Sequence, residues 1–166
     1  VPHDQIPDDS PLRTLYEWPD FRVFLESVLD VPVFPYADTL SSININYYEK
    51  GLQLGWHYDN ASFAITLMVQ AAEEGGEFEY LEKVRNQETG EQGYADTEAV
   101  IKGSLKPKKL KMGEGALVLF RGRNSLHRVA PVASERARIL VTLNFNTEPG
   151  VMLSELARMT FFGRIV

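Results

Sequence analysis

The spacing of hydrophobic and polar residues along this chain changes near residue 41. Before that point, the stretch 18–29 places apolar residues three and four apart, which predicts a helix that covers one face of a core. The apolar positions of this helix are Phe21, Phe24, Leu25, Val28 and Leu29. Ser10 followed by Pro11 predicts the N-cap and first turn of an earlier helix. The front of the chain is therefore expected to be helical.

From residue 41 onward the pattern indicates β-strands. The stretches 41–48 and 137–145 alternate polar and apolar residues, whereas 63–69 and 116–120 are short apolar runs of strand length. Glycine-rich breaks separate these segments. Many short strands joined by glycine turns are typical of a sandwich, a barrel or a jelly roll.

A polar insertion at residues 83–104 interrupts the strand pattern. Asp96 is expected to cap a short helix within it that ends at Gly103. The chain shows no internal repeat and no clear domain boundary, so we expect one mainly β domain over residues 1–166. The first residue is Val1 rather than Met, which fits a chain trimmed at its N-terminus.

Composition narrows the class of protein. The chain has 166 residues, 44% of them hydrophobic, which is enough for one sizeable core. It has no cysteine, which excludes disulfides and thiol nucleophiles and fits a cytoplasmic location. No apolar run is long enough for a membrane-spanning helix, and the net charge of −6 argues against a nucleic-acid partner. The lysine-rich stretch 106–111 is expected to be a solvated loop that leads into a strand.

Candidate chemistry begins with "GWHYDN" at residues 55–60. His57 and Asp59 lie two apart in an expected strand, so their side chains should point the same way. His127 belongs to a later expected strand and is the best candidate for a third ligand. Two imidazoles and one carboxylate on one face leave positions open on an octahedral metal, as in non-haem Fe(II) oxygenases, although zinc accepts the same ligands. The sequence therefore predicts a metal site at His57, Asp59 and His127.

Two arginines follow the distal histidine in the next expected strand. Arg136 and Arg138 share one face of that strand by parity, and Thr142 and Asn144 continue it. An arginine that points inward beside a metal is costly unless an anion pairs with it. A dicarboxylate that binds the metal with one end and a guanidinium with the other would satisfy both groups.

These residues resemble the Fe(II)/2-oxoglutarate-dependent dioxygenases. The resemblance covers about residues 41–148 and rests on His57-x-Asp59, on "HRVAPVASERARI" from His127 onward, and on the pattern N-x-Y-x-x-G-x-x-L-x-x-H-x-D that begins at Asn46. Four further stretches make the chain similar to the bacterial branch of free-amino-acid hydroxylases and their halogenase relatives: "GGEFEY" (75–80), "LVLFRGRNSLHRV" (117–129), "NTEPG" (146–150) and "FFGR" (161–164).

The resemblance implies a fold and an activity. The expected fold is mainly β, a double-stranded β-helix (jelly-roll, cupin-like) core with flanking N-terminal helices and a short inserted helix. The expected cofactors are Fe(II), 2-oxoglutarate and O2. The expected reaction hydroxylates an unactivated C–H bond of a small molecule and releases succinate and CO2. A free amino acid is among the candidate substrates. Halogenating relatives carry a small residue in place of the metal-binding carboxylate. Because Asp59 fills that position here, the resemblance implies hydroxylation or desaturation.

The resemblance also suggests roles around the metal ligands. Arg138 is expected to anchor 2-oxoglutarate, with Arg136 as the alternative that other branches would favour. Expected contacts of 2-oxoglutarate are Asn46, Tyr48 and Thr66. Expected contacts of the substrate are Asn60, Thr142, Asn144 and Arg121. Each of these polar residues also has an ordinary structural explanation: edge-strand polarity, core packing or a turn.

Several alternatives stay open from the sequence. A dioxygenase acting on a peptide or a nucleic acid would share much of this pattern, and a non-catalytic β-barrel would bind metal without forming succinate. A zinc hydrolase is weakened because no additional general base is evident. Phe78 and Phe120 are expected to be packing residues, while Glu77 and Glu79 are either contacts for a cationic substrate or solvated strand residues. Neither the substrate nor the oligomeric state can be read from the pattern.

Overall fold

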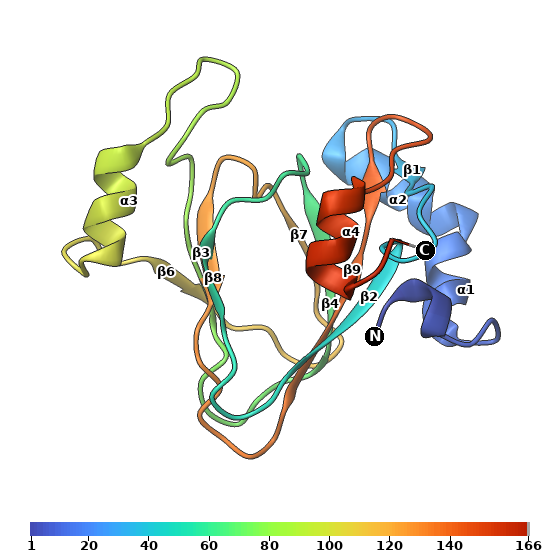
Figure 1. Ribbon diagram of the computed structural model, residues 1–166, viewed down its shortest axis with the longest axis horizontal. Coiled ribbons are helices and arrows are strands. Elements are labelled where there is room, and N and C mark those ends of the chain that lie inside the picture. The colour runs from blue at the N-terminus through green and yellow to red at the C-terminus, as the bar shows by residue number, and fades with distance from the viewer. Residues whose placement is uncertain (166) are drawn as a thin grey trace. The chain divides into compact units, whose positions relative to one another are not determined.

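The computed structural model describes residues 1–165, which form two compact units (Figure 1). The terminal unit comprises Val1–Asn46 and Val141–Val166, and the central unit comprises Tyr47–Leu140. The expectation of a single domain stays a prediction. Among the described residues, no helix is both long enough and apolar enough to cross a membrane.

The helices of the terminal unit follow the predicted pattern in part. They are η1 (His3–Gln5), α1 (Pro11–Glu17), α2 (Pro19–Leu29) and α4 (Glu155–Phe162). The prediction for Ser10 is confirmed, because its hydroxyl accepts a hydrogen bond from the Leu12 amide at 3.3 Å and Pro11 begins α1. α2 buries Phe21, Leu25 and Leu29. The prediction was wrong for Phe24 and Val28, which are 46% and 54% exposed, so the buried stripe of α2 is narrower than its apolar pattern.

The last expected strand divides in two. Residues Arg138–Leu143 form β9 and Phe145–Asn146 form β10, which pairs antiparallel with β1 (Phe34–Pro35). α4, which the pattern did not predict, begins where the Ser154 hydroxyl accepts from the Ala157 amide at 3.2 Å. No residue of α4 is buried.

Two four-stranded sheets make up most of the β structure, and every strand pairing described is antiparallel. The first sheet has the order β2-β9-β4-β7, and its other strands are β2 (Ile43–Tyr48), β4 (Ala64–Gln70) and β7 (Leu117–Phe120). The second has the order β3-β8-β5-β6 and comprises β3 (Leu54–His57), β8 (Leu126–Val129), β5 (Phe78–Leu81) and β6 (Lys108–Leu110). The predicted strands at 41–48, 63–69 and 116–120 are confirmed as β2, β4 and β7. The chain is therefore mainly antiparallel β with helices.

The polar insertion folds onto the central unit. It contains α3 (Tyr94–Ile101), which lies near β6 in Figure 1. The cap prediction was wrong, because α3 follows Gly93 in a left-handed conformation and Asp96 lies inside its first turn. The insertion contributes Val84 and Val100 to a small core that also holds Leu126; the partly buried residues packed against this core are Trp56, Tyr58, Leu81 and Leu105.

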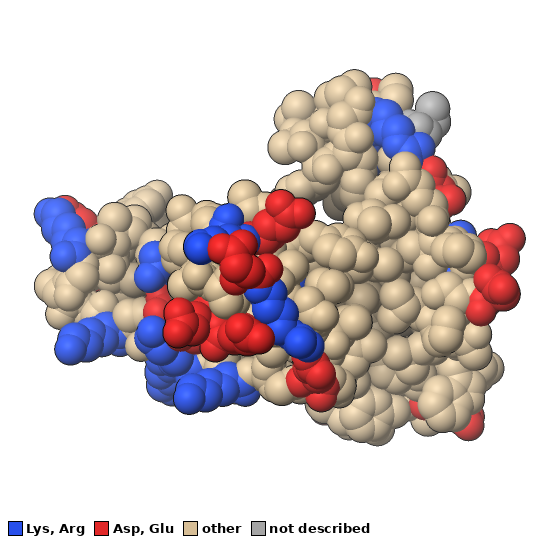
Figure 2. Space-filling view, turned by 90° about the horizontal axis from the view of Figure 1, so that it is seen from below, with Lys and Arg blue, Asp and Glu red and all other residues tan. Residues whose placement is uncertain are grey.

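Charged side chains of both signs are mixed on the face of the molecule shown in Figure 2. In the lysine-rich stretch, Lys108 pairs with Glu82 at 3.0 Å and Lys109 with Glu79 at 3.1 Å. Glu79 is only 5% exposed and also pairs with Arg128 at 2.7 Å, so its carboxylate is held between two cross-strand cations on β6 and β8. Two of the lysines of 106–111 are thus neutralised within the sheet.

Candidate metal centre

The pairing of β3 with β8 decides which side chains face each other at the site. Leu54 lies opposite Val129, but the register shifts between Leu54 and His57. A regular ladder from Leu54 would place Trp56 opposite His127, whereas the extra residue places His57 there. The two imidazole rings lie 4.1 Å apart between centroids. A one-residue bulge in β3 therefore brings the two histidines together.

Asp59 completes the group of possible metal ligands. One ligand atom from each of His57, Asp59 and His127 lies within 4.8 Å of the others. The Asp59 Oδ1 atom is 3.6 Å from Nε2 of His57 and 3.4 Å from Nε2 of His127. Asp59 lies two residues beyond the end of β3, rather than on the strand as expected. Its position depends instead on the loop, where its amide donates to the Gly122 carbonyl at 3.2 Å.

Backbone carbonyls orient both imidazoles toward Asp59. Nδ1 of His57 is 2.8 Å from the Gly55 carbonyl, and Nδ1 of His127 is 2.9 Å from the Ser125 carbonyl. Because a carbonyl can only accept, each Nδ1 carries the proton and donates it. When the imidazoles are neutral, their Nε2 lone pairs are therefore left for a metal, and a carbonyl on Nδ1 is the usual support given to metal-binding histidines.

The charges of the group suit a cation. Burial alone would raise the pKa of Asp59, but hydrogen bonds and charge from His127 and His57 hold it far below its ordinary value. Burial alone would lower the pKa of His57, yet the Asp59 carboxylate and the Gly55 carbonyl raise it. The Asp59 Oδ2 atom is buried and has no hydrogen-bond partner among the described residues. An ionised carboxylate with a buried, unpaired oxygen fits a metal ligand, because such an atom is otherwise costly.

Gly122 makes room for this carboxylate. A Cβ atom at residue 122 would lie 1.8 Å from Oδ2 of Asp59 and 3.0 Å from Cε1 of His127. Any side chain at this position would therefore displace the Asp59 carboxylate. In the sequence, Gly122 belongs to one of the glycine-rich breaks between expected strands, and nothing there indicated this role.

Aromatic rings pack around the His127 ring. Phe120 packs edge-on against the His127 ring with centroids 4.9 Å apart, and Phe78 lies 5.5 Å from it. Tyr80 is directly opposite His127 in the pairing of β5 with β8 and 5.8 Å from the Phe120 ring. Phe78 and Phe120 pack as predicted, and what they pack against is the candidate metal site.

The two candidate anchoring arginines differ sharply in environment. Arg136 is exposed, donates to the Ala71 carbonyl at 3.2 Å, and pairs with Glu114 at 2.6 Å. Arg138 is 1% exposed, and none of its three guanidinium nitrogens has a hydrogen-bond partner among the described residues. Its Cζ lies 5.4 Å from the centroid of the Tyr48 ring, and burial lowers its pKa. A buried guanidinium without an anion is costly, so Arg138 has the environment of a carboxylate-binding residue.

The other predicted contacts are dispersed in the two units. In the central unit, Thr66 is half-buried on β4 opposite Val118, and Asn60 and Arg121 are exposed. In the terminal unit, Asn46 donates to the Asn44 carbonyl at 3.4 Å, Thr142 to the same carbonyl at 3.5 Å, and Asn144 to the Ser41 carbonyl. Their proposed contacts with 2-oxoglutarate or substrate stay predictions.

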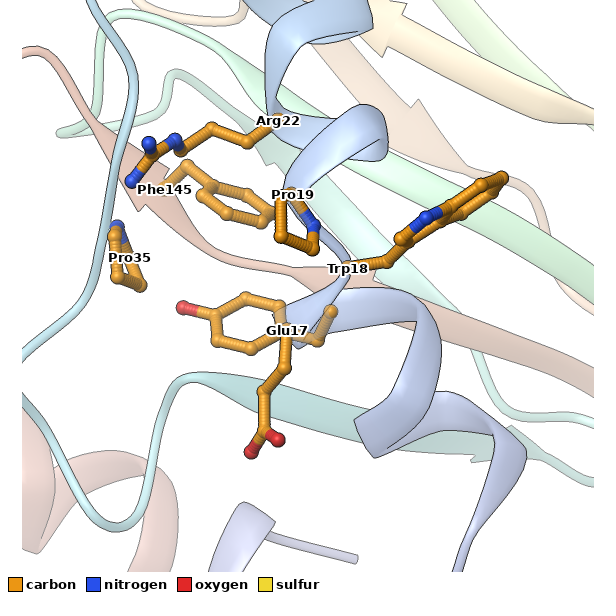
Figure 3. Close-up of a pocket in the computed structure, with 7 residues that line it drawn as sticks. Glu17, Trp18, Pro19, Arg22, Pro35 and Phe145 are labelled. Atoms are coloured by element: carbon orange, nitrogen blue, oxygen red, sulfur yellow. The ribbon is translucent and has the colours of Figure 1, made fainter.

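A separate pocket of about 250 Å³ lies wholly within the terminal unit (Figure 3). It is lined by Tyr16, Glu17, Trp18, Pro19, Arg22, Pro35 and Phe145. In Figure 3 the Arg22 guanidinium lies toward Pro35, and the Trp18 ring points to the opposite side. None of the predicted site residues lines this pocket.

The chain was compared with protein-family models, curated proteins and solved structures. The family model for halogenase D matches residues 1–158. An oxidoreductase of the 2OG-Fe(II) oxygenase family from Burkholderia pseudomallei is 16% identical with a TM-score of 0.63, and the match covers 88% of this chain and 59% of that one. This chain therefore spans less than two thirds of that relative. A search of curated proteins found no match.

Two further solved structures share the fold. AviO1 from Streptomyces viridochromogenes Tue57 is 15% identical with a TM-score of 0.63, and the match covers 93% of this chain and 68% of that one. A prolyl-4-hydroxylase from Pseudomonas putida is 14% identical with a TM-score of 0.50, covering 82% and 68%. At such identities the likeness shows the fold alone, whereas the family model covers nearly the whole sequence. The chain thus belongs to the halogenase D family.

Proposed function

We propose that this protein hydroxylates an unactivated C–H bond of a small molecule, with a free amino acid as the first candidate. We further propose that its core is a double-stranded β-helix. The observation that carries the proposal is the convergence of His57, Asp59 and His127, with Asp59 Oδ2 buried and unpaired. Two imidazoles and one carboxylate are the donor set of non-haem Fe(II) oxygenases and leave further metal positions for other ligands.

Each residue has a defined task in this proposal. When bound, Fe(II), 2-oxoglutarate and O2 supply the oxidising power, and succinate and CO2 are released. His57, Asp59 and His127 hold the metal, while the Gly55 and Ser125 carbonyls keep both imidazoles in the correct tautomer. Aromatic rings from β5 and β7 cover the His127 ring and exclude water from that side of the site.

Arg138 is proposed to bind the remote carboxylate of 2-oxoglutarate. Its burial and its three unpaired nitrogens support this role, because a guanidinium forms paired hydrogen bonds to a carboxylate. The competing residue, Arg136, already pairs with Glu114. Tyr48, whose ring lies beside the Arg138 guanidinium, is proposed to contact 2-oxoglutarate as well.

Hydroxylation, rather than halogenation, is supported by two positions. Asp59 supplies a carboxylate where the resemblance gives halogenating relatives a small residue, so a halide would have to compete with a protein ligand. Gly122 leaves the space that this carboxylate occupies. The chain thus provides both the third ligand and the room for it.

A spectroscopic titration tests the proposal. Under anaerobic conditions, Fe(II) and 2-oxoglutarate added to the wild-type protein should give a weak visible charge-transfer band, and His57→Ala should not. Admission of O2 should then release succinate from the wild type. Metal binding without the band or succinate would contradict the proposal and favour a β-barrel that only binds metal.

A further inference from the structure

We propose that Arg85, in the polar insertion 83–104, is a positioning residue that holds the Asp59 ligand in place. The inference rests on the proposed function, because the ion that Asp59 would bind is the metal assigned there. It gives the insertion a task at the metal centre: its arginine joins the two loops between which the Asp59 carboxylate lies.

One guanidinium contacts both of these loops. Arg85 Nε donates to the Arg123 carbonyl at 2.6 Å, and its Nη2 lies 3.5 Å from the Asp59 carbonyl. Its Cζ stacks 4.1 Å from the centroid of the Tyr58 ring. The Arg85 side chain therefore contacts the residue before Asp59, Asp59 itself, and the turn that follows Gly122.

Other hydrogen bonds close a ring around this contact. Arg123 donates through Nε and Nη2 to the Asn60 carbonyl at 3.1 and 2.6 Å. The Asp59 amide donates to the Gly122 carbonyl, and the Arg85 amide donates to the Asn124 carbonyl at 3.3 Å. Residues 58–60 and 122–124 are thus joined directly by their own hydrogen bonds and also through Arg85. Removing Arg85 takes away a side chain that comes from outside the two segments and contacts both, while the bond from Arg123 to Asn60 remains.

The position of Asp59 requires such support. The residue lies beyond the end of β3, so no strand pairing fixes it. Its Oδ2 occupies a space in which even one extra carbon on Gly122 would clash, so a small shift of either loop would alter the carboxylate. Metal ligands need supporting contacts to hold their geometry, and loss of such a contact typically costs 10- to 100-fold in metal affinity.

A purely structural role for Arg85 makes a different prediction. The insertion is also attached through the Tyr58 hydroxyl, which lies 2.8 Å from the Thr97 hydroxyl on α3. Thr97→Val removes this hydrogen bond and leaves the contacts of Arg85 with Asp59, Arg123 and the Tyr58 ring in place. If Arg85 only stabilised the insertion, its loss and the loss of the Thr97 bond would affect metal binding alike.

The test compares wild type, Arg85→Ala, Arg85→Lys and Thr97→Val by anaerobic calorimetric titration with Mn(II), together with thermal unfolding of the metal-free proteins. Arg85→Ala should bind Mn(II) roughly 10-fold or more weakly. Arg85→Lys should show a smaller loss, because lysine keeps the charge but loses the planar fork. Thr97→Val should keep wild-type affinity even where its melting temperature falls.

The outcomes separate the two proposals. Wild-type affinity in both Arg85 variants, with metal binding intact, overturns the role of Arg85 and leaves the proposed function standing. Equal weakening in Thr97→Val also overturns it. A wild-type protein that binds no Mn(II) and no Fe(II) overturns the proposed function and this inference together. Should Arg85→Ala fail to fold, Arg85→Lys still decides.

Discussion

At the scale of single residues, the buried guanidinium of Arg138 is the strongest sign that a ligand completes this protein. Surface arginines such as Arg136 find an acidic partner on the chain, but Arg138 has none among the described residues. Leaving a buried cation unpaired costs several kcal/mol in general. The proposed contact between Arg138 and the remote carboxylate of 2-oxoglutarate would remove this cost.

Replacing Arg138 should weaken 2-oxoglutarate and spare the metal. Arg138→Met should raise the KM for 2-oxoglutarate by 100-fold or more, about 3 kcal/mol, because a buried charge-assisted pair is lost. Mn(II) affinity should stay unchanged. Succinate release measured against 2-oxoglutarate concentration gives the KM, and Arg136→Met is the matched control. Should the Arg136 variant show the larger effect, the anchor has been assigned to the wrong arginine.

Gly122 allows an equally local test. In Gly122→Ala the new methyl would lie 1.8 Å from the present Oδ2 of Asp59, so the carboxylate must move and metal affinity should fall roughly 10-fold or more. Gly113→Ala is the control, because a Cβ at Gly113 meets nothing within 4 Å and its φ is not positive. Calorimetric titration with Mn(II) compares the two, and equal affinities would show that Gly122 is not needed.

At the scale of elements, a buried aspartate holds the C-terminal segment within the terminal unit. Asp38 accepts hydrogen bonds from the Leu40 and Leu153 amides at 2.8 and 3.0 Å and pairs with Arg158 of α4 at 3.0 Å. α4 buries none of its own residues, so polar contacts at Asp38 contribute much of its attachment. Burial alone would raise the pKa of Asp38, but these donors lower it overall.

Stability should therefore fall in acid because of Asp38. A carboxyl whose pKa is lowered by folding stabilises the protein above its unfolded pKa of about 3.9, and this contribution is lost as the pH falls through the lower folded pKa. Asp38→Asn should lower the free energy of unfolding at pH 7 by about 3 kcal/mol. It should also make the free energy of unfolding fall less steeply with decreasing pH below pH 4. Urea unfolding across pH measures both.

A control identifies the cause of the acid effect. Asp4→Asn removes the ion pair between Asp4 and Arg164, which is partly exposed, and should cost about 1 kcal/mol or less. If the free energy of unfolding falls as steeply below pH 4 in Asp38→Asn as in wild type, other carboxylates cause the loss of stability in acid.

At the scale of the whole molecule, the chemistry depends on the complete set of ligands. With Asp59 in place, oxidised products should gain an oxygen atom whether or not chloride or bromide is added. Mass spectrometry of amino-acid mixtures incubated with Fe(II), 2-oxoglutarate and O2 would show this. A halogenated product from the wild type would contradict the proposal, and normal turnover by Asp59→Ala would contradict the ligand assignment.

Much of this architecture could be predicted from the sequence, because some patterns are local. The apolar runs at 63–69 and 116–120 became β4 and β7, and Ser10 capped α1 as expected. Errors arose where tertiary contacts override local preference. Phe24 follows a helical stripe yet is exposed, and Asp96 lies inside a helix that begins earlier at Gly93. Neither outcome can be inferred without knowing what packs nearby.

The donors of the candidate metal centre can be read from the sequence, because a side chain's chemistry and its spacing from a neighbour are local properties. How those donors meet depends on the packing of separate strands and loops. A bulge in β3 turns His57 rather than Trp56 toward His127, and a space over Gly122 receives Asp59. The contacts of Arg85 are likewise long-range, and they depend on how separate segments pack, which no local pattern records.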